Sequence, residues 1–208
     1  MGQKVNPTSL RISTNKNWKS QWFSRNQLGE LVVEDFQIRK IINNNLKNAA
    51  IDRIEIKRDQ QVVNIIIVTA RPGVIIGRGG KGVTIISDLL IKKFSGKKFN
   101  IDILEIKNPE LSAKIVADNI AYQISKRVSY RRAAKQAIEK VITAGALGVQ
   151  IRVSGRLGGA EIARVERFTR GSLPLSTFRS DIDFAMVHSI TTYGTIGVKV
   201  WIHRKSGE

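Results

Sequence analysis

One short segment constrains the fold of this chain more than any other. Residues 77–82 read Gly-Arg-Gly-Gly-Lys-Gly, so four of six positions are glycine. Glycine adopts left-handed backbone conformations without strain and lets other atoms approach the main chain closely. A helix is predicted directly after this segment, from apolar residues that recur every three or four positions: Val83, Ile86, Leu90 and Phe94. The chain must therefore make a tight turn with few side chains and continue at once into a helix.

Two phosphate-binding motifs fit this segment poorly. Gly77, Gly79 and Gly82 satisfy the dinucleotide-binding pattern G-x-G-x-x-G. In that motif the first glycine directly follows a strand, whereas residues 72–76 intervene here after a strand that ends near Ala70. A P-loop requires Ser or Thr after its lysine, and Gly82 stands in that place. We therefore expect no cofactor.

The Gly-x-x-Gly loop of a KH domain matches this segment better. In a KH domain the loop joins two helices and clamps the backbone of about four nucleotides. Arg78 and Lys81 would add positive charge at the point of contact. A plain glycine-rich turn between helices is the simpler alternative. The predicted RNA-binding residues of the loop are Gly77, Arg78, Gly79, Gly80 and Lys81.

Hydrophobic periodicity predicts an α+β fold of two domains. The expected elements are a helix over 34–47, strands over 51–56 and 62–70, the glycine loop, a helix from 83 and a strand over 97–107. After Asn108-Pro109 come helices around 116–124 and 131–142 and strands around 149–153, 182–186 and 198–202. The prediction is a basic arm with the start of the first helix over 1–37, a type II KH domain over 38–107, and a two-helix plus mixed β-sheet domain over 108–208.

The charge balance favours a polyanionic partner. The chain has 35 Lys and Arg against 17 Asp and Glu, a formal charge of +18. Nucleic acid is the first candidate and an anionic membrane the second. Residues 62–70, the longest apolar stretch, are far too short for a membrane helix, and the N-terminus lacks the apolar core of a signal peptide. We expect a soluble cytoplasmic protein without a membrane partner.

Nothing in the sequence indicates catalysis. The chain has no cysteine, which excludes disulfides, cysteine-based zinc sites and a cysteine nucleophile. No nucleophile–base pattern is visible, so neither an enzyme nor a small-molecule substrate is expected. Asp181 and Asp183 could form a metal-binding pair, but their alternation with apolar residues favours the polar face of a strand. His188 shares the parity of Ile182 and Phe184 and is expected in the core.

Basic residues gather at three further places. Residues 1–29 contain no acid, and they form either a disordered tail or an arm that docks on protein or RNA. Residues 126–135 hold five cations without an acid, and three of them, Arg131, Arg132 and Lys135, share the start of a helix, where cations oppose the helix dipole. That face either meets an anion or is solvated. Arginine, which grips phosphate bidentately, replaces lysine between 150 and 179. The expected phosphate contacts are Arg11, Lys126, Arg127, Arg156, Arg164, Arg167, Arg170 and Arg179.

Several segments together resemble the bacterial form of the protein-three family of the small ribosomal subunit. They are Met1 to Pro7, Thr69 to Gly77, Val153 to Arg164, Asp181 to Asp183, Thr191 to Gly194 and Gly197 to Trp201. The resemblance covers essentially the whole chain. It implies binding to ribosomal RNA in the subunit head, contacts with neighbouring head proteins, and a place beside the channel through which messenger RNA enters.

The resemblance also implies a role in unwinding structured messenger RNA without nucleotide hydrolysis. The basic positions tied to that role in the family match Arg131, Arg132 and Lys135. A free KH-domain RNA-binding regulator is the alternative function. Such a regulator more often repeats the module and keeps aromatic residues for base stacking, whereas aromatic residues are only 6% of this chain.

Overall fold

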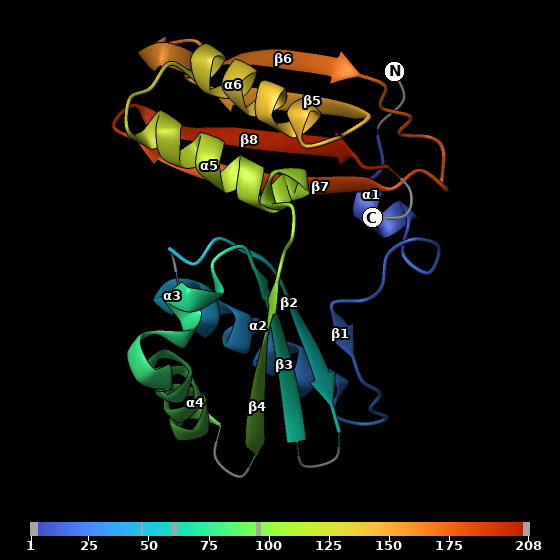
Figure 1. Ribbon diagram of the computed structural model, residues 1–208, viewed down its shortest axis with the longest axis vertical. Helices are drawn as coiled ribbons and strands as arrows, with labels where there is room; N and C mark the ends of the chain where they lie inside the picture. Colours follow the sequence, from blue (N-terminus) through green and yellow to red (C-terminus); the bar gives the residue numbers. More distant parts are fainter. Residues whose placement is uncertain (1–3, 47, 60–61, 95–96, 206–208) are drawn as a thin grey trace. The chain divides into compact units, whose positions relative to one another are not determined.

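The computed structural model describes residues 4–46, 48–59, 62–94 and 97–205, with the side chain of Arg78 outside the description (Figure 1). The chain divides into two compact units. One is Trp18–Lys107, here called the KH unit, and the other, the C-terminal unit, joins Met1–Asn17 to Asn108–Glu208. Among the helices within these described ranges, none is long and apolar enough to cross a membrane.

The KH unit contains a mixed four-stranded sheet in the order β1-β2-β3-β4. Its elements are β1 (Ser20–Gln21), α2 (Leu28–Asn45), β2 (Ile51–Arg58), β3 (Val62–Thr69), α3 (Pro72–Ile76), the 3-10 turn η1 (Arg78–Gly80), α4 (Lys81–Lys93) and β4 (Lys98–Glu105). β2 and β3 form an antiparallel hairpin, while β1 and β4 pair in parallel at the two edges. From α2 onward the order helix, strand, strand, helix, helix, strand confirms the predicted KH fold.

The core of the KH unit lies between its helices and one sheet face. Alternate β-strand residues such as Ile54, Ile56, Ile65 and Ile67 are buried together with Ile42 of α2. α4 contributes its apolar side through residues spaced four apart, Ile86 and Leu90. The glycine loop stands at the N-terminal end of α4, at the rim of this core.

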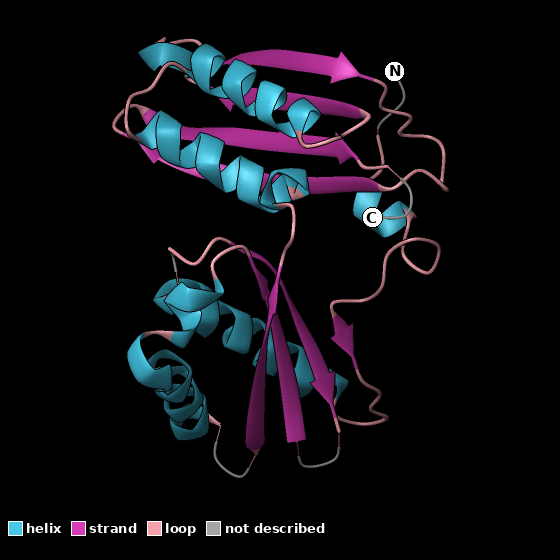
Figure 2. Ribbon diagram, viewed as in Figure 1, coloured by secondary structure: helices cyan, strands magenta, loops and turns pink. Residues whose placement is uncertain are grey.

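The C-terminal unit places two helices on one face of a four-stranded sheet (Figure 2). Its elements are α1 (Pro7–Leu10), η2 (Pro109–Leu111), α5 (Ala113–Ser125), α6 (Tyr130–Thr143), β5 (Gly148–Gly155), η3 (Leu157–Gly159), β6 (Arg164–Gly171), β7 (Ile182–Thr191) and β8 (Gly194–His203). The strand order is β6-β5-β8-β7, and all three pairings are antiparallel. The α+β class is confirmed, but the mixed sheet expected in this domain is found in the KH unit instead.

The predicted arm over 1–37 is shared between the two units. Residues 4–17 dock on the C-terminal unit, where α1 contacts β7. Residues 18–37 belong to the KH unit, because β1 extends its sheet and α2 begins at Leu28, earlier than expected. Val32 and Val33, in the first turns of α2, are exposed. The apolar residues there do not continue the spacing of the buried residues of α2, which explains why the sequence pattern placed the start of the helix too late.

Candidate nucleic-acid interface

The glycine loop has a backbone that other residues would strain. Gly77, Gly79 and Gly80 have φ values of +67°, +63° and +77°, which lie in the left-handed region. Gly82 is required for another reason, since a Cβ there would overlap the carbonyl oxygen of Ile75. The glycines therefore allow α3 and α4 to approach closely through their backbones. Gly77 follows α3 rather than a strand, so the dinucleotide-binding interpretation fails.

The outer side of this loop is suited to a phosphate. A Cβ on Gly79 or Gly80 would meet no atom within 4 Å, so the space beside the turn is open. α4 begins without an acidic residue in its first turn and without a side-chain cap, so no described side chain accepts from the backbone N–H groups of that turn. Lys81 is exposed at this end. The loop thus offers backbone donors, a helix dipole and a cation on one surface.

A second basic surface lies on α6. Arg131, Arg132 and Lys135 are exposed, while Ala134 and Ile138 on the other side of the helix are buried. Together with Ser129, Gln136 and Glu139 the three cations line a shallow depression. The first turn of α6 contains no acid, and the Ser129 side chain does not cap it. The predicted cation face is therefore present and open.

Glu166 is a member of this surface that the sequence did not single out. Its carboxylate accepts hydrogen bonds from Arg131 Nη2 at 2.8 Å and Nε at 3.1 Å, and from the Tyr130 hydroxyl at 2.7 Å. The bonds from Arg131 and Tyr130 hold the pKa of Glu166 at about 2, so the carboxylate stays charged. Glu166 comes from β6, a strand that was not predicted, and only the register of that strand brings it to α6.

The predicted arginines of the C-terminal unit do not form one patch. Arg167 pairs with Arg152, and Arg152 pairs with Lys199 on the next strand, so these three cations form a row across one sheet face. Arg164 and Arg170 have the opposite parity on β6 and share a face with Glu166. Of the other predicted contacts, Lys126, Arg127 and Arg179 are exposed and Arg156 is half-buried.

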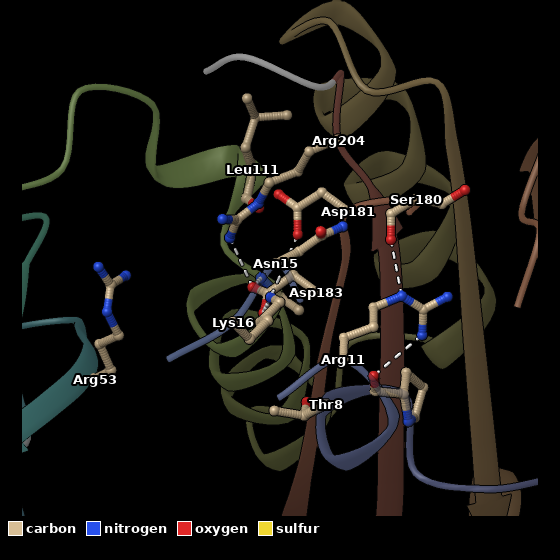
Figure 3. A network of polar contacts seen from close by, with 12 residues as sticks. Thr8, Arg11, Asn15, Lys16, Arg53, Leu111, Ser180, Asp181, Asp183 and Arg204 are labelled. Carbon is tan, nitrogen blue, oxygen red and sulfur yellow. Dashed lines mark hydrogen bonds and ion pairs between the residues drawn. The ribbon is translucent and has the colours of Figure 1, made fainter. Parts of the chain in front are cut away.

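Arg11 corrects the sequence interpretation. Its side chain is fully buried, and the guanidinium donates to the carbonyl oxygens of Ser180 at 2.8 Å, Pro7 at 3.0 Å, Leu175 at 3.1 Å and Thr177 at 2.8 Å. Figure 3 shows its guanidinium bonded to Ser180. A phosphate cannot reach it in this fold, because the side chain is fully buried and four main-chain carbonyls accept from its guanidinium. Arg11 instead fastens the N-terminal segment to the loop that precedes β7.

Asp181 and Asp183 belong to a cluster of ion pairs near Arg11. The Asp183 carboxylate accepts from Lys16 Nζ at 3.0 Å, Arg204 Nη2 at 2.7 Å and the Ala113 backbone N–H at 2.9 Å (Figure 3). Burial alone would raise the pKa of Asp183, but Arg204, Lys16 and Ala113 together lower it. Asp181 lies 3.6 Å from the same lysine. These carboxylates therefore hold Lys16 of the N-terminal segment against the rest of the C-terminal unit through ion pairs.

Known proteins resemble this chain over almost its full length. A family model described as KH domain matches residues 37–111, and one described as ribosomal protein S3, C-terminal domain, matches residues 120–202. A relative from Halalkalibacterium halodurans is 48% identical, and one from Bacillus thuringiensis is 49% identical, each over 98% of this chain and 93% of the relative. Both are named small ribosomal subunit protein uS3. The chain therefore belongs to the uS3 family of small ribosomal subunit proteins.

Proposed function

We propose that this protein is a structural constituent of the small ribosomal subunit that binds ribosomal RNA in the subunit head and contacts messenger RNA where it enters. Family membership supports the ribosomal role. The open glycine loop of the KH unit supports RNA binding. The observation that carries the contact with messenger RNA is the exposed cation face of α6, Arg131, Arg132 and Lys135.

The three cations of this face differ in their surroundings. Arg131 is held by Glu166 and so has a defined direction, whereas no ion pair joins Arg132 or Lys135 to an acid in the described ranges. A bidentate pair through Nε and Nη2 leaves Nη1 of Arg131 for a phosphate. We infer that Arg131 is an oriented contact, and that Arg132 and Lys135 supply adaptable charge to an RNA strand that moves.

The test compares ribosomes with Arg131, Arg132 and Lys135 changed to Ala against parent ribosomes. We expect normal subunit assembly, because the glycine loop and the remaining cations are intact. Relative to parent ribosomes, the variant should elongate more slowly on a message with a stable hairpin and at the same rate on an unstructured message. A matched variant, Lys40, Lys92 and Lys93 changed to Ala, removes three exposed cations from the KH unit and should not produce this difference. Equal slowing on both messages, or none, would contradict the proposed contact.

The alternative, a free RNA-binding regulator, is separated by sedimentation of a cell lysate. A ribosomal constituent co-sediments with small subunits at physiological salt, along with neighbouring head proteins. A regulator would remain largely in the light fractions. Performed on an isolated cytoplasmic fraction, the same sedimentation tests the expected localisation, which is ribosome-bound protein in that fraction.

A further inference from the structure

A groove in the C-terminal unit adjoins the cation face of α6, and Ser129 lines both. Its volume is about 540 Å³. It lies where the end of α5, the start of α6, the turn η3 and the hairpin between β7 and β8 meet. Its walls include Arg127, Tyr130, Arg156 and Tyr193, and none of the fourteen described residues that line it carries a carboxylate. The groove therefore combines aromatic rings and positive charge.

One wall of the groove presents an exposed aromatic ring on a rigid support. Tyr193 is 59% exposed, and Ile190 beside it in the lining is 80% exposed. A Cβ on Gly159 would lie 3.4 Å from ring atoms Cδ2 and Cε2 of Tyr193, so the ring rests against the backbone of η3. Arg156 ties the same two turns together, donating from Nε to the Ala160 carbonyl at 3.0 Å and from Nη1 to the Tyr193 carbonyl at 3.1 Å. These two hydrogen bonds use Nε and Nη1 of Arg156 and do not involve Nη2.

The lining of the groove also includes a cation at a strained backbone position. Arg127 has φ +63° directly after α5, where glycine is the usual residue. Its N–H donates to the Ile124 carbonyl at 2.9 Å, so the left-handed turn is part of the helix end. Residues other than glycine are unfavourable in this backbone conformation, yet an exposed arginine stands at this position. Ser129, which begins α6 without capping it, lines the groove nearby.

We propose that this groove holds one unpaired nucleotide of an RNA strand, with the base on Tyr193 and the phosphate at Arg127. This inference deepens the proposed function and rests on it, since it assumes that RNA reaches this unit. Stacking on an exposed ring tolerates any base, because every base has an aromatic face. The charge of the groove complements a phosphate, since its described lining holds two arginines and no carboxylate, and the Glu166 carboxylate bonded to Tyr130 is already paired with Arg131.

The first experiment measures binding of the full chain to a six-nucleotide oligouridylate and to a duplex RNA of the same length. Tyr193→Leu keeps an apolar side chain and removes the ring, and we expect roughly tenfold weaker binding of the single strand with little change for the duplex. Tyr122→Leu is the matched control, because Tyr122 is 63% exposed on α5 and does not line the groove. Equal losses for the two variants would overturn the proposal.

Arg127→Gly provides a second test with two opposite readouts. Glycine relieves the left-handed strain, so the variant should unfold at a higher temperature while binding the single strand more weakly. Ultraviolet crosslinking of the oligouridylate, mapped by mass spectrometry, should yield an adduct at Tyr193 or Tyr130. Adducts found only elsewhere, or an Arg127→Gly variant that binds as well as the parent, would refute the site.

Two further outcomes separate this proposal from related ideas. Uridine monophosphate should bind much more weakly than the oligonucleotide, and equal affinity would show a free-nucleotide site and overturn the assignment to an RNA strand. If the α6 triple variant slows hairpin messages while Tyr193→Leu behaves like Tyr122→Leu, the groove fails and the proposed function stands. If the protein binds neither RNA form, both fail.

Discussion

Replacement of Arg11 by Ala should destabilise the C-terminal unit without a specific effect on RNA binding. The buried Pro7 carbonyl would lose its partner, at a cost of roughly 1–3 kcal/mol, and the three part-buried bonds to Leu175, Thr177 and Ser180 would each contribute roughly 0.5–1 kcal/mol. The variant no longer buries a charge, which offsets part of this loss. We therefore expect a net decrease of about 3 kcal/mol in the free energy of unfolding.

The assay is calorimetric unfolding of the full chain, with Lys4→Ala as control because Lys4 is exposed in the same segment. For a unit of this size the expected decrease corresponds to a melting temperature lower by roughly 10 °C. Hydrogen exchange should accelerate in residues 4–16 and 172–181. Below the melting temperature, affinity for RNA should match that of Lys4→Ala. A small shift in melting temperature together with a larger loss of RNA affinity would show that Arg11 contacts phosphate after all.

Three other changes test the remaining geometry. Gly82→Ala should lower the free energy of unfolding of the KH unit, measured in urea, by about 1–3 kcal/mol, because its Cβ would overlap the Ile75 carbonyl. Gly79→Ala should cost less, because its Cβ makes no such overlap and only the left-handed backbone is strained. Arg78→Asp with Lys81→Asp should weaken RNA binding while the circular dichroism spectrum stays unchanged, and unfolding would contradict a contact role. The pKa of Asp183 is lower in the folded protein than in the unfolded chain. Asp183 therefore stabilises the fold fully above its unfolded pKa of about 3.9, and this stabilisation is lost as the pH falls through the lower folded pKa. Asp183→Asn should therefore reduce the dependence of stability on acid, measured by melting from pH 6 to pH 2.

Local patterns predicted the elements whose signals are contained within a few neighbouring residues. The apolar spacing of α4 and α6 and the alternation in β2, β3, β5 and β8 all lead to elements near the expected positions. β6 was missed because it lies at the sheet edge and is mostly exposed, so Arg164 to Gly171 shows no apolar alternation. The residue that depends on it, Glu166, was missed for the same reason.

The face of a strand was harder to predict than its existence. β7 lies where expected, but His188 is exposed rather than packed in the core. The helices cover the other face, as the Ser189 hydroxyl shows by donating to the Ala121 carbonyl of α5 at 2.8 Å. Apolar residues stand at both odd and even positions of β7. On the face that the helices leave uncovered, Phe184 packs against Trp201 with ring centroids 5.1 Å apart. Alternation alone therefore could not identify the covered side.

The role of a cation in this protein depends on contacts that composition does not record. Two arginines of this +18 chain show the difference. Arg11 donates hydrogen bonds to four main-chain carbonyls. Arg58 forms ion pairs with Glu34 and Asp35, and its side chain is only 6% exposed. Both are used for folding. Arg131 represents an intermediate case, because Glu166 orients it at the surface without covering it.

An acid within a basic surface need not oppose RNA binding. Two flexible cations must lose side-chain entropy when they grip a phosphate, whereas an arginine already held by a carboxylate has lost that freedom on folding. Glu166 reduces the net charge of the α6 face by one and in return presents Arg131 in a fixed direction. Arg132 and Lys135, with no acid pairing them in the described ranges, keep the side-chain freedom that the proposed contact with a moving strand would use. If this face contacts messenger RNA as proposed, the arrangement of these four side chains matters more for that contact than their summed charge.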